Sequence, residues 1–160
     1  MLLSEADEIQ LGKQSDAGIV QTYGVYNDPA LTQYVSEIGQ KMVKISHRPG
    51  LKFEFKVMDS PVINAFAVPG GFVYVTRGIL AHLNNEAEFA GVLGHEIGHV
   101  TARHSAKQYS KAQLFQLGFG LGSALSETFR KYAGIANFGV GMLFLKFSRD
   151  NERQADQLGV

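Results

Sequence analysis

Residues 95–99 read His-Glu-Ile-Gly-His, within a segment that is predicted to form one continuous helix. Positions i and i+4 of a helix lie on one face about one turn apart, so His95 and His99 can present two imidazole nitrogens to one metal ion. Glu96 points about 100° away from His95, close enough to reach a water on that metal but not usually the metal itself. Two nitrogen ligands and a separate carboxylate are typical of a zinc hydrolase.

The helix that carries this motif is predicted to begin near residue 86 and to run to about His104. Asn85 is a suitable N-cap, and Glu88 stands at the third helical position, as in a capping box. One face is apolar and should meet the core: Phe89, Leu93, Ile97 and Val100. The face beside the histidines carries three glycines, Gly91, Gly94 and Gly98. Because glycine lowers helix propensity, we expect another backbone element to pack closely there.

A catalytic zinc usually has three protein ligands, so the histidine pair needs a third group. His104 is the nearest candidate, but five helical steps rotate it about 140° from His99. A third histidine six residues after the second would occupy position 105, which is Ser105. His104 is therefore predicted to lie at the surface or beside a ligand.

Glu152 is the better candidate for the third ligand, on a helix predicted over residues 149–160. Asp156 lies one turn later on the same face, where its carboxylate could accept a hydrogen bond from the distal nitrogen of a zinc-bound histidine. The alternative is a solvated helix face in which Glu152, Arg153 and Asp156 form charge pairs. Zinc would lower the pKa of its water, with Glu96 as general base. For the oxyanion, the sequence offers only Arg149 as a weak guess, or a group past Val160.

The other elements predict a mostly helical α+β chain. Helices are expected over residues 3–23 and 29–45, the second with Asp28 as N-cap and Pro29 at its first position. Alternating apolar residues predict strands over 52–58, 62–67 and 72–76. The turn Pro69-Gly70-Gly71 makes a hairpin across residues 62–76, and a short helix is expected over 77–83.

The segment Asn64-Ala65-Phe66-Ala67 has two interpretations. As a sheet edge beside the helix, it could pair with an extended peptide, and Asn64 would add a side-chain amide to that contact. Alternatively, it is a plain core strand in which Asn64 is satisfied internally.

Residues 112–146 differ in composition, with six glycines and only four charged residues. They are predicted to form a pair of buried or mobile helices. The functional alternative is a lid, or a surface that rests on a membrane or a partner.

The bulk composition excludes several classes of protein. The 160 residues suggest one domain, and 15 basic and 15 acidic residues give no net charge that would favour a nucleic-acid partner. Cysteine is absent, so any zinc is held by His, Asp or Glu. No segment reaches about 20 consecutive apolar residues, as a transmembrane helix needs. No signal peptide is visible at the start. The final helix has no clear stop signal, so residues 1–160 are expected to be a catalytic domain truncated at its C-terminal end.

These motifs together resemble metallopeptidase family 48, which includes the HtpX heat-shock proteases, the CAAX prenyl proteases and the BepA-type periplasmic proteases. The matching pieces are the run from Asn64 to Gly71, the run from Leu93 to His104, and Glu152 with Ala155-Asp156. Because membrane spans are missing, the chain is most similar to the soluble BepA-type branch, whose members often continue into helical repeats.

The resemblance implies a zincin-like (gluzincin) domain with a small sheet beside the active-site helix. It implies one Zn²⁺ per chain on His95, His99 and Glu152, Glu96 as catalytic base and Asp156 in support. It also implies a substrate-binding edge strand at Asn64 and Ala65. The expected function is a zinc endopeptidase acting on unfolded or misassembled envelope proteins, in the bacterial periplasm or associated with its membranes.

Two other functions stay open at this point. One is a chaperone-like binding protein that keeps zinc and cleaves little. The other is a purely structural zinc site, which would need a fourth protein ligand.

Overall fold

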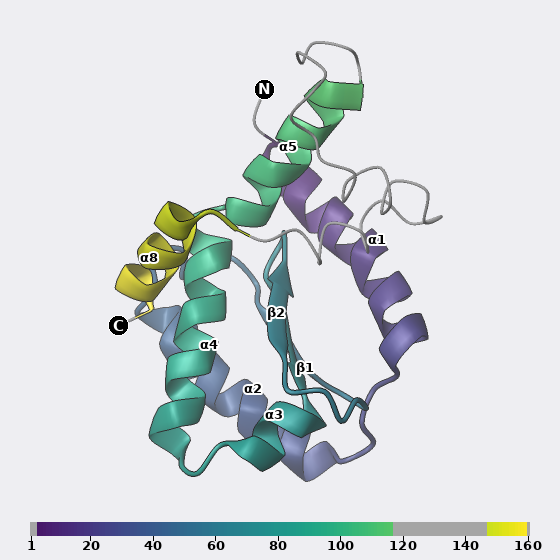
Figure 1. Cartoon of the computed structure of the whole chain (residues 1–160), viewed down its shortest axis with the longest axis vertical. Coiled ribbons are helices and arrows are strands. Elements are labelled where there is room, and N and C mark those ends of the chain that lie inside the picture. Colours follow the sequence, from purple (N-terminus) through teal and green to yellow (C-terminus); the bar gives the residue numbers. More distant parts are fainter. Residues whose placement is uncertain (1–2, 117–146, 160) are drawn as a thin grey trace.

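A three-stranded sheet runs through the middle of the molecule, with helices on both of its faces (Figure 1). In this computed structural model, residues 3–116 and 147–159 are described. The strand order is β1 (Glu54–Met58), β3 (Phe72–Thr76) and β2 (Ala65–Val68). β1 is parallel to β3, whereas β2 is antiparallel to it. β2 is therefore an edge strand.

The hairpin of β2 and β3 confirms the sequence prediction. Val68 pairs with Phe72, and the turn between them contains Gly70 and Gly71 with φ values of +87° and +94°. Only glycine adopts such angles without strain, which explains the Pro-Gly-Gly sequence. β3 begins and ends as predicted, whereas β1 and β2 begin two and three residues later than expected.

The larger core lies between the sheet and two helices, α2 (Pro29–Lys44) and α4 (Glu86–Thr101). Val73 and Val75 of the central strand point into it, against Leu93 of α4. α2 begins as the sequence predicts, because the Asp28 side chain accepts a hydrogen bond from the backbone N–H of Leu31 and Pro29 is the first helical residue. Leu93 is fully buried, so the predicted core face of α4 is confirmed.

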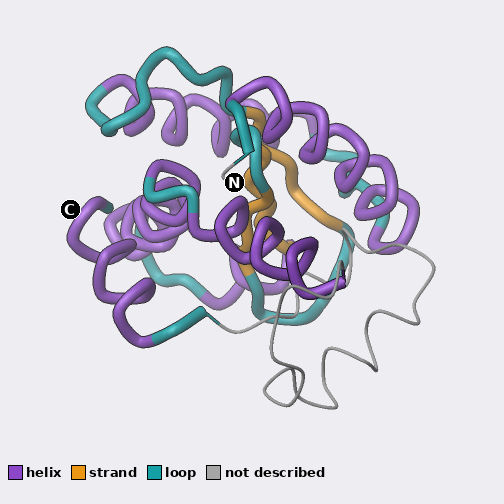
Figure 2. Tube along the Cα trace, turned by 90° about the horizontal axis from the view of Figure 1, so that it is seen from above, coloured by secondary structure: helices purple, strands orange, loops and turns teal. Residues whose placement is uncertain are grey.

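The second face of the sheet is covered by α1 (Glu5–Tyr23). Figure 2 shows the strands enclosed between helices. Tyr74 is fully buried on this face, and its hydroxyl donates a 2.7 Å hydrogen bond to Asp16 of α1. Lys56 of β1 forms an ion pair with the same carboxylate at 2.6 Å. Burial and then the hydrogen bond to Asp16 raise the pKa of the Tyr74 hydroxyl, which therefore stays protonated as the donor.

The helix of the histidine motif does not continue to His104, and this prediction was wrong. α4 ends at Thr101, and α5 (His104–Gln116) starts in a new direction. Arg103 between them has φ +60°, a left-handed conformation that interrupts a helix and is uncommon outside glycine.

The remaining helices are α3 (Arg77–His82) and α8 (Arg149–Leu158), both predicted with small differences at their ends. Of the segment 112–146, residues 112–116 belong to α5 and residues 117–146 lie outside the described part of the chain. Among the described helices, none is long and apolar enough to cross a membrane.

A buried ion-pair cluster holds the turn between α4 and α5. Glu8 of α1 is only 1% exposed, and its carboxylate pairs with both Arg48 and Arg103. Arg103 also donates to the backbone carbonyl of Leu3. A left-handed arginine costs about 1–3 kcal/mol and persists only when its surroundings fix it. Here the contacts from α1 supply that restraint.

Replacing Glu8 by alanine should lower the free energy of unfolding by about 3–5 kcal/mol, because two arginines would lose their buried partner. Glu5 is the matched control: it pairs with the same Arg48 but its side chain is 60% exposed. Glu5→Ala should cost less than about 1 kcal/mol. Urea unfolding of the two variants would measure both values, and equal losses would contradict the importance given to the buried cluster.

Candidate metal centre

The two histidines of the motif are placed by a well-defined helix start. The Asn85 side chain accepts a 2.9 Å hydrogen bond from the backbone N–H of Glu88, so α4 begins at Glu86 as predicted. From this start, the apolar face of α4 packs against the larger core. His95 and His99 follow one turn apart on a neighbouring face, His99 buried and His95 partly exposed.

α8 crosses this face of α4 in backbone contact, beside it in Figure 1. A Cβ atom added at Gly98 would lie 2.4 Å from the carbonyl oxygen of Ala155, and one at Gly94 would lie 2.4 Å from that of Gly159. No side chain fits at either position. The predicted close packing beside the histidines is therefore confirmed for these two glycines. It was wrong for Gly91, where an added Cβ would meet nothing within 4 Å.

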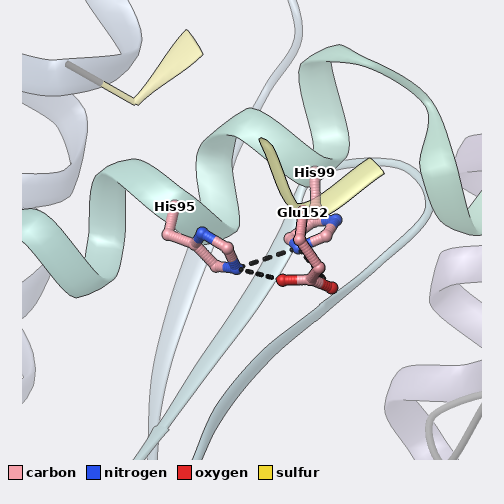
Figure 3. A group of neighbouring side chains, drawn as sticks. All are labelled: His95, His99 and Glu152. Carbon is pink, nitrogen blue, oxygen red and sulfur yellow. Dashed lines mark hydrogen bonds and ion pairs between the residues drawn. The ribbon is translucent and has the colours of Figure 1, made fainter. Parts of the chain in front are cut away.

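This crossing brings Glu152 to the histidine pair (Figure 3). Nε2 of His95 lies 3.0 Å from Nε2 of His99 and 3.1 Å from Oε2 of Glu152. Nε2 of His99 lies 3.6 Å from Oε1 of the same carboxylate. The three side chains are the one group of metal-ligating residues of this kind within the described ranges.

These separations fit a tetrahedral zinc site. Zinc ligands at about 2.0–2.1 Å from the metal are separated from one another by roughly 3.3 Å along each tetrahedral edge. The two Nε2 atoms are separated by nearly that distance, and each has one Glu152 oxygen at a similar distance, Oε2 for His95 and Oε1 for His99. Two imidazoles and one carboxylate also form a donor set that zinc accepts, with a fourth position left for water or substrate.

Other side chains contact the two imidazoles at Nδ1, on the side opposite the candidate metal position. Nδ1 of His95 lies 2.7 Å from Oδ1 of Asp156, the contact expected of a supporting carboxylate. Nδ1 of His99 lies 2.9 Å from Nδ1 of His104. Phe147 stacks on the His99 ring with 4.2 Å between ring centroids. Nε2 of each imidazole therefore points toward the other two candidate ligands.

Burial and neighbouring charges shift the pKa values of His99 and Glu96. Burial, followed by His95 and His104, lowers the pKa of His99 to about 4, so this imidazole is neutral at pH 7 and able to bind a cation. Burial and then the Glu152 carboxylate raise the pKa of Glu96 to about 8. A divalent cation nearby would act in the opposite direction on Glu96 and favour the carboxylate that a general base requires.

A surface hollow of about 530 Å³ opens beside the cluster. Its walls come from three parts of the chain that the sequence analysis singled out separately. These are the start of β2 with Asn64 and Ala65, the helix α4 with His95 and Glu96, and Asp156 of α8. Asn64 is exposed, so it does not sit inside a core strand. The predicted substrate strand and the predicted general base thus face one hollow.

A comparison with known proteins gives the family. The model of peptidase family M48 matches residues 29–160. The chain belongs to peptidase family M48. The resemblance found in the sequence is therefore confirmed.

Several M48 relatives cover most of this chain. A beta-barrel assembly-enhancing protease of Escherichia coli (strain K12) is 33% identical over an alignment of 167 residues, gaps included, that covers 99% of this chain and 34% of the relative. The protein of the same name from Yersinia pestis is 36% identical, with 83% of this chain and 29% of the relative covered. The mitochondrial metalloendopeptidase OMA1 of Schizosaccharomyces pombe is 36% identical, with 81% and 38% covered. The chain thus spans about a third of the length of these relatives.

One contact of this M48 site was predicted from the sequence only as an alternative, and another was not predicted. His104 was expected at the surface or beside a ligand, and the structure gives the second outcome: His104 is completely buried in contact with the candidate ligand His99. No sequence pattern predicts the turn at Arg103 that places His104 beside His99. Phe147 was not predicted, because no pattern in the sequence before the N-cap Ser148 indicates that it stacks on His99. Arg149 is exposed at the first residue of α8, and its role in stabilising the oxyanion stays a prediction.

Gly98→Ala should weaken zinc binding about tenfold or more, because the new methyl group pushes α8 and Glu152 away from the histidines. Gly91→Ala is the matched control on the same helix. It adds the same methyl group in open space and should leave zinc affinity unchanged while stabilising the helix by up to about 1 kcal/mol. Competition with a chromogenic chelator would measure both affinities. Equal affinities in the two variants would show that the close crossing does not position Glu152.

Proposed function

We propose that this chain is a zinc-dependent endopeptidase domain with a zincin-like active site. The observation that carries the proposal is the convergence of His95, His99 and Glu152 at tetrahedral spacing, with Glu96 beside them on the wall of the hollow. Membership of family M48 and the names of the relatives support it. The three side chains would hold one Zn²⁺, and Asp156 would fix the orientation of His95.

When bound, zinc would supply Lewis acidity, which lowers the pKa of water and polarises the substrate carbonyl. The remaining steps belong to the protein. Glu96 accepts a proton from the attacking water and then delivers it to the nitrogen of the leaving amine. His99 stays neutral at pH 7, and Asp156 fixes His95 through its Nδ1. A structural zinc site would close its coordination with a fourth protein ligand. Within residues 3–116 and 147–159, the candidate group contains three residues.

The substrate would bind as an extended strand along β2. The Asn64 carbonyl accepts a hydrogen bond from the Thr76 backbone N–H, so the backbone of Asn64 faces β3. Backbone groups alternate in direction along a strand, so those of Ala65 face away from β3, toward the open edge. A peptide can pair with such an edge by strand addition. Recognition through the backbone suits unfolded segments of many sequences.

The biological setting is carried over from the relatives. Since proteins similar to this chain are named beta-barrel assembly-enhancing proteases, we assign it to the removal of unfolded or misassembled envelope proteins. The corresponding location is the bacterial periplasm or the envelope membranes. The mitochondrial relatives of similar identity show that the same domain also serves another compartment.

Glu96→Gln should keep zinc binding and reduce cleavage of unfolded casein by about 10²–10⁴-fold, because the amide cannot accept the proton. Glu86→Gln, at the exposed start of the same helix, is the control and should cleave as the wild type does. Normal cleavage by the Glu96 variant would refute the general-base role. Zinc binding without any cleavage by the wild-type chain would instead favour a chaperone-like binding protein.

Asn64→Ala should raise KM for an extended peptide about two- to tenfold with little change in kcat, since one hydrogen bond to bound substrate is lost. Asn27→Ala, in a separate surface hollow, should leave both constants unchanged. Steady-state kinetics with a fluorogenic peptide would give the two constants separately. An unchanged KM would remove Asn64 from the substrate site.

A further inference from the structure

His104 is a buried polar residue for which the proposed mechanism has no use. Its side chain is completely inaccessible, although it is the first residue of α5 and follows the left-handed Arg103 directly. The turn reverses the expected direction of its side chain: on a continuous helix it would point away from His99, whereas here the two rings lie in contact.

His104 is the middle one of three side chains that are linked by hydrogen bonds. Nδ1 of His99 lies 2.9 Å from Nδ1 of His104, and Nε2 of His104 lies 3.0 Å from Oε1 of Gln154 on α8. An amide oxygen only accepts hydrogen bonds, so Nε2 of His104 carries the proton. In a neutral imidazole Nδ1 is then the acceptor, and His99 must donate from its own Nδ1.

The donor-to-acceptor direction of these hydrogen bonds determines which nitrogen of His99 can bind a metal. A neutral His99 that is protonated on Nδ1 has its lone pair on Nε2, the atom that lies 3.0 Å from Nε2 of His95 and 3.6 Å from Oε1 of Glu152. The opposite direction would place a proton on Nε2 and prevent ligation. The stacked ring of Phe147 restrains the same imidazole from its face.

The two histidine ligands are thus oriented by different groups from one helix. Asp156 of α8 contacts His95 directly, whereas Gln154 of α8 reaches His99 through His104. We propose that His104 and Gln154 are positioning residues, which fix His99 in the tautomer and orientation that binds the metal. This inference rests on the metal centre of the proposed function.

Zinc affinity of purified variants tests the proposal. His104→Leu removes the acceptor but keeps an apolar side chain in the buried site, and zinc affinity should fall about 10–100-fold. His104→Asn restores an acceptor close to the position of Nδ1 and should bind more tightly than the leucine variant. Gln154→Leu should also weaken binding, whereas Gln157→Leu, exposed on the same helix, should not. Wild-type affinity in a folded His104→Leu variant would overturn the proposal.

The tautomers themselves provide a second measurement that needs no substitution. Long-range ¹H–¹⁵N spectra of the zinc-loaded wild-type chain should show the proton of His104 on Nε2 and that of His99 on Nδ1. A proton on Nδ1 of His104 would overturn the proposal, even where His104→Leu fails to fold.

These measurements separate the proposal from the proposed function. A chain that binds zinc through the expected tautomers but does not cleave casein would refute the peptidase activity and leave the role of His104 standing. If the wild-type chain cleaves casein and His104→Leu binds zinc with unchanged affinity, the peptidase activity stands and the role of His104 is refuted. Absence of zinc binding by the wild-type chain would overturn both.

Discussion

The backbone contact between α4 and α8 is the interaction on which the candidate centre depends. Two glycines in the middle of α4 cost about 1 kcal/mol each in helix propensity relative to alanine, and the structure shows what they permit. With Gly94 and Gly98 against Ala155 and Gly159, the helices approach as closely as their main chains allow. At that distance a side chain as short as glutamate reaches across to the histidines. The glycines therefore help to build the candidate metal centre, although they carry no ligand side chain.

The same crossing decides the electrostatics of the site. α8 contributes both Glu152 and Asp156, so acidic groups gather around the two imidazoles. Glu152 also contributes to the raised pKa of Glu96. Carboxylates crowded in this way repel one another, and a divalent cation would relieve the repulsion. Because the edge of β2 borders the same hollow, Ala65 and the Glu96 carboxylate lie on one side of α4.

Local sequence signals were sufficient for most of the fold. The caps at Asp28 and Asn85 and the turn at Gly70–Gly71 are short-range features, and α2 and α4 begin, and the hairpin turns, where predicted. The third member of the candidate ligand group was also inferred from the sequence, because Glu152 and Asp156 keep helical spacing after a motif that needs a third group.

Two errors of prediction have separate physical causes. The end of α4 was missed because Arg103 adopts a left-handed conformation, and its side chain bonds to Leu3 and to Glu8, which lies 95 residues earlier in the chain. A sequence window around His104 contains neither partner. The turn at Arg103 also places the buried His104 against His99. Gly91 was misjudged for the opposite reason: its spacing matches that of the packed glycines, but α8 does not extend to it.

A cation that binds two side chains of α4 and one of α8 would also be a non-covalent cross-link between distant parts of the chain. By mass action, each tenfold increase of free cation above its dissociation constant adds about 1.4 kcal/mol to the docking of α8. Without the cation, that helix of ten residues would exchange its amide protons faster and be more exposed to other proteases. The supply of metal would then set the stability of this domain.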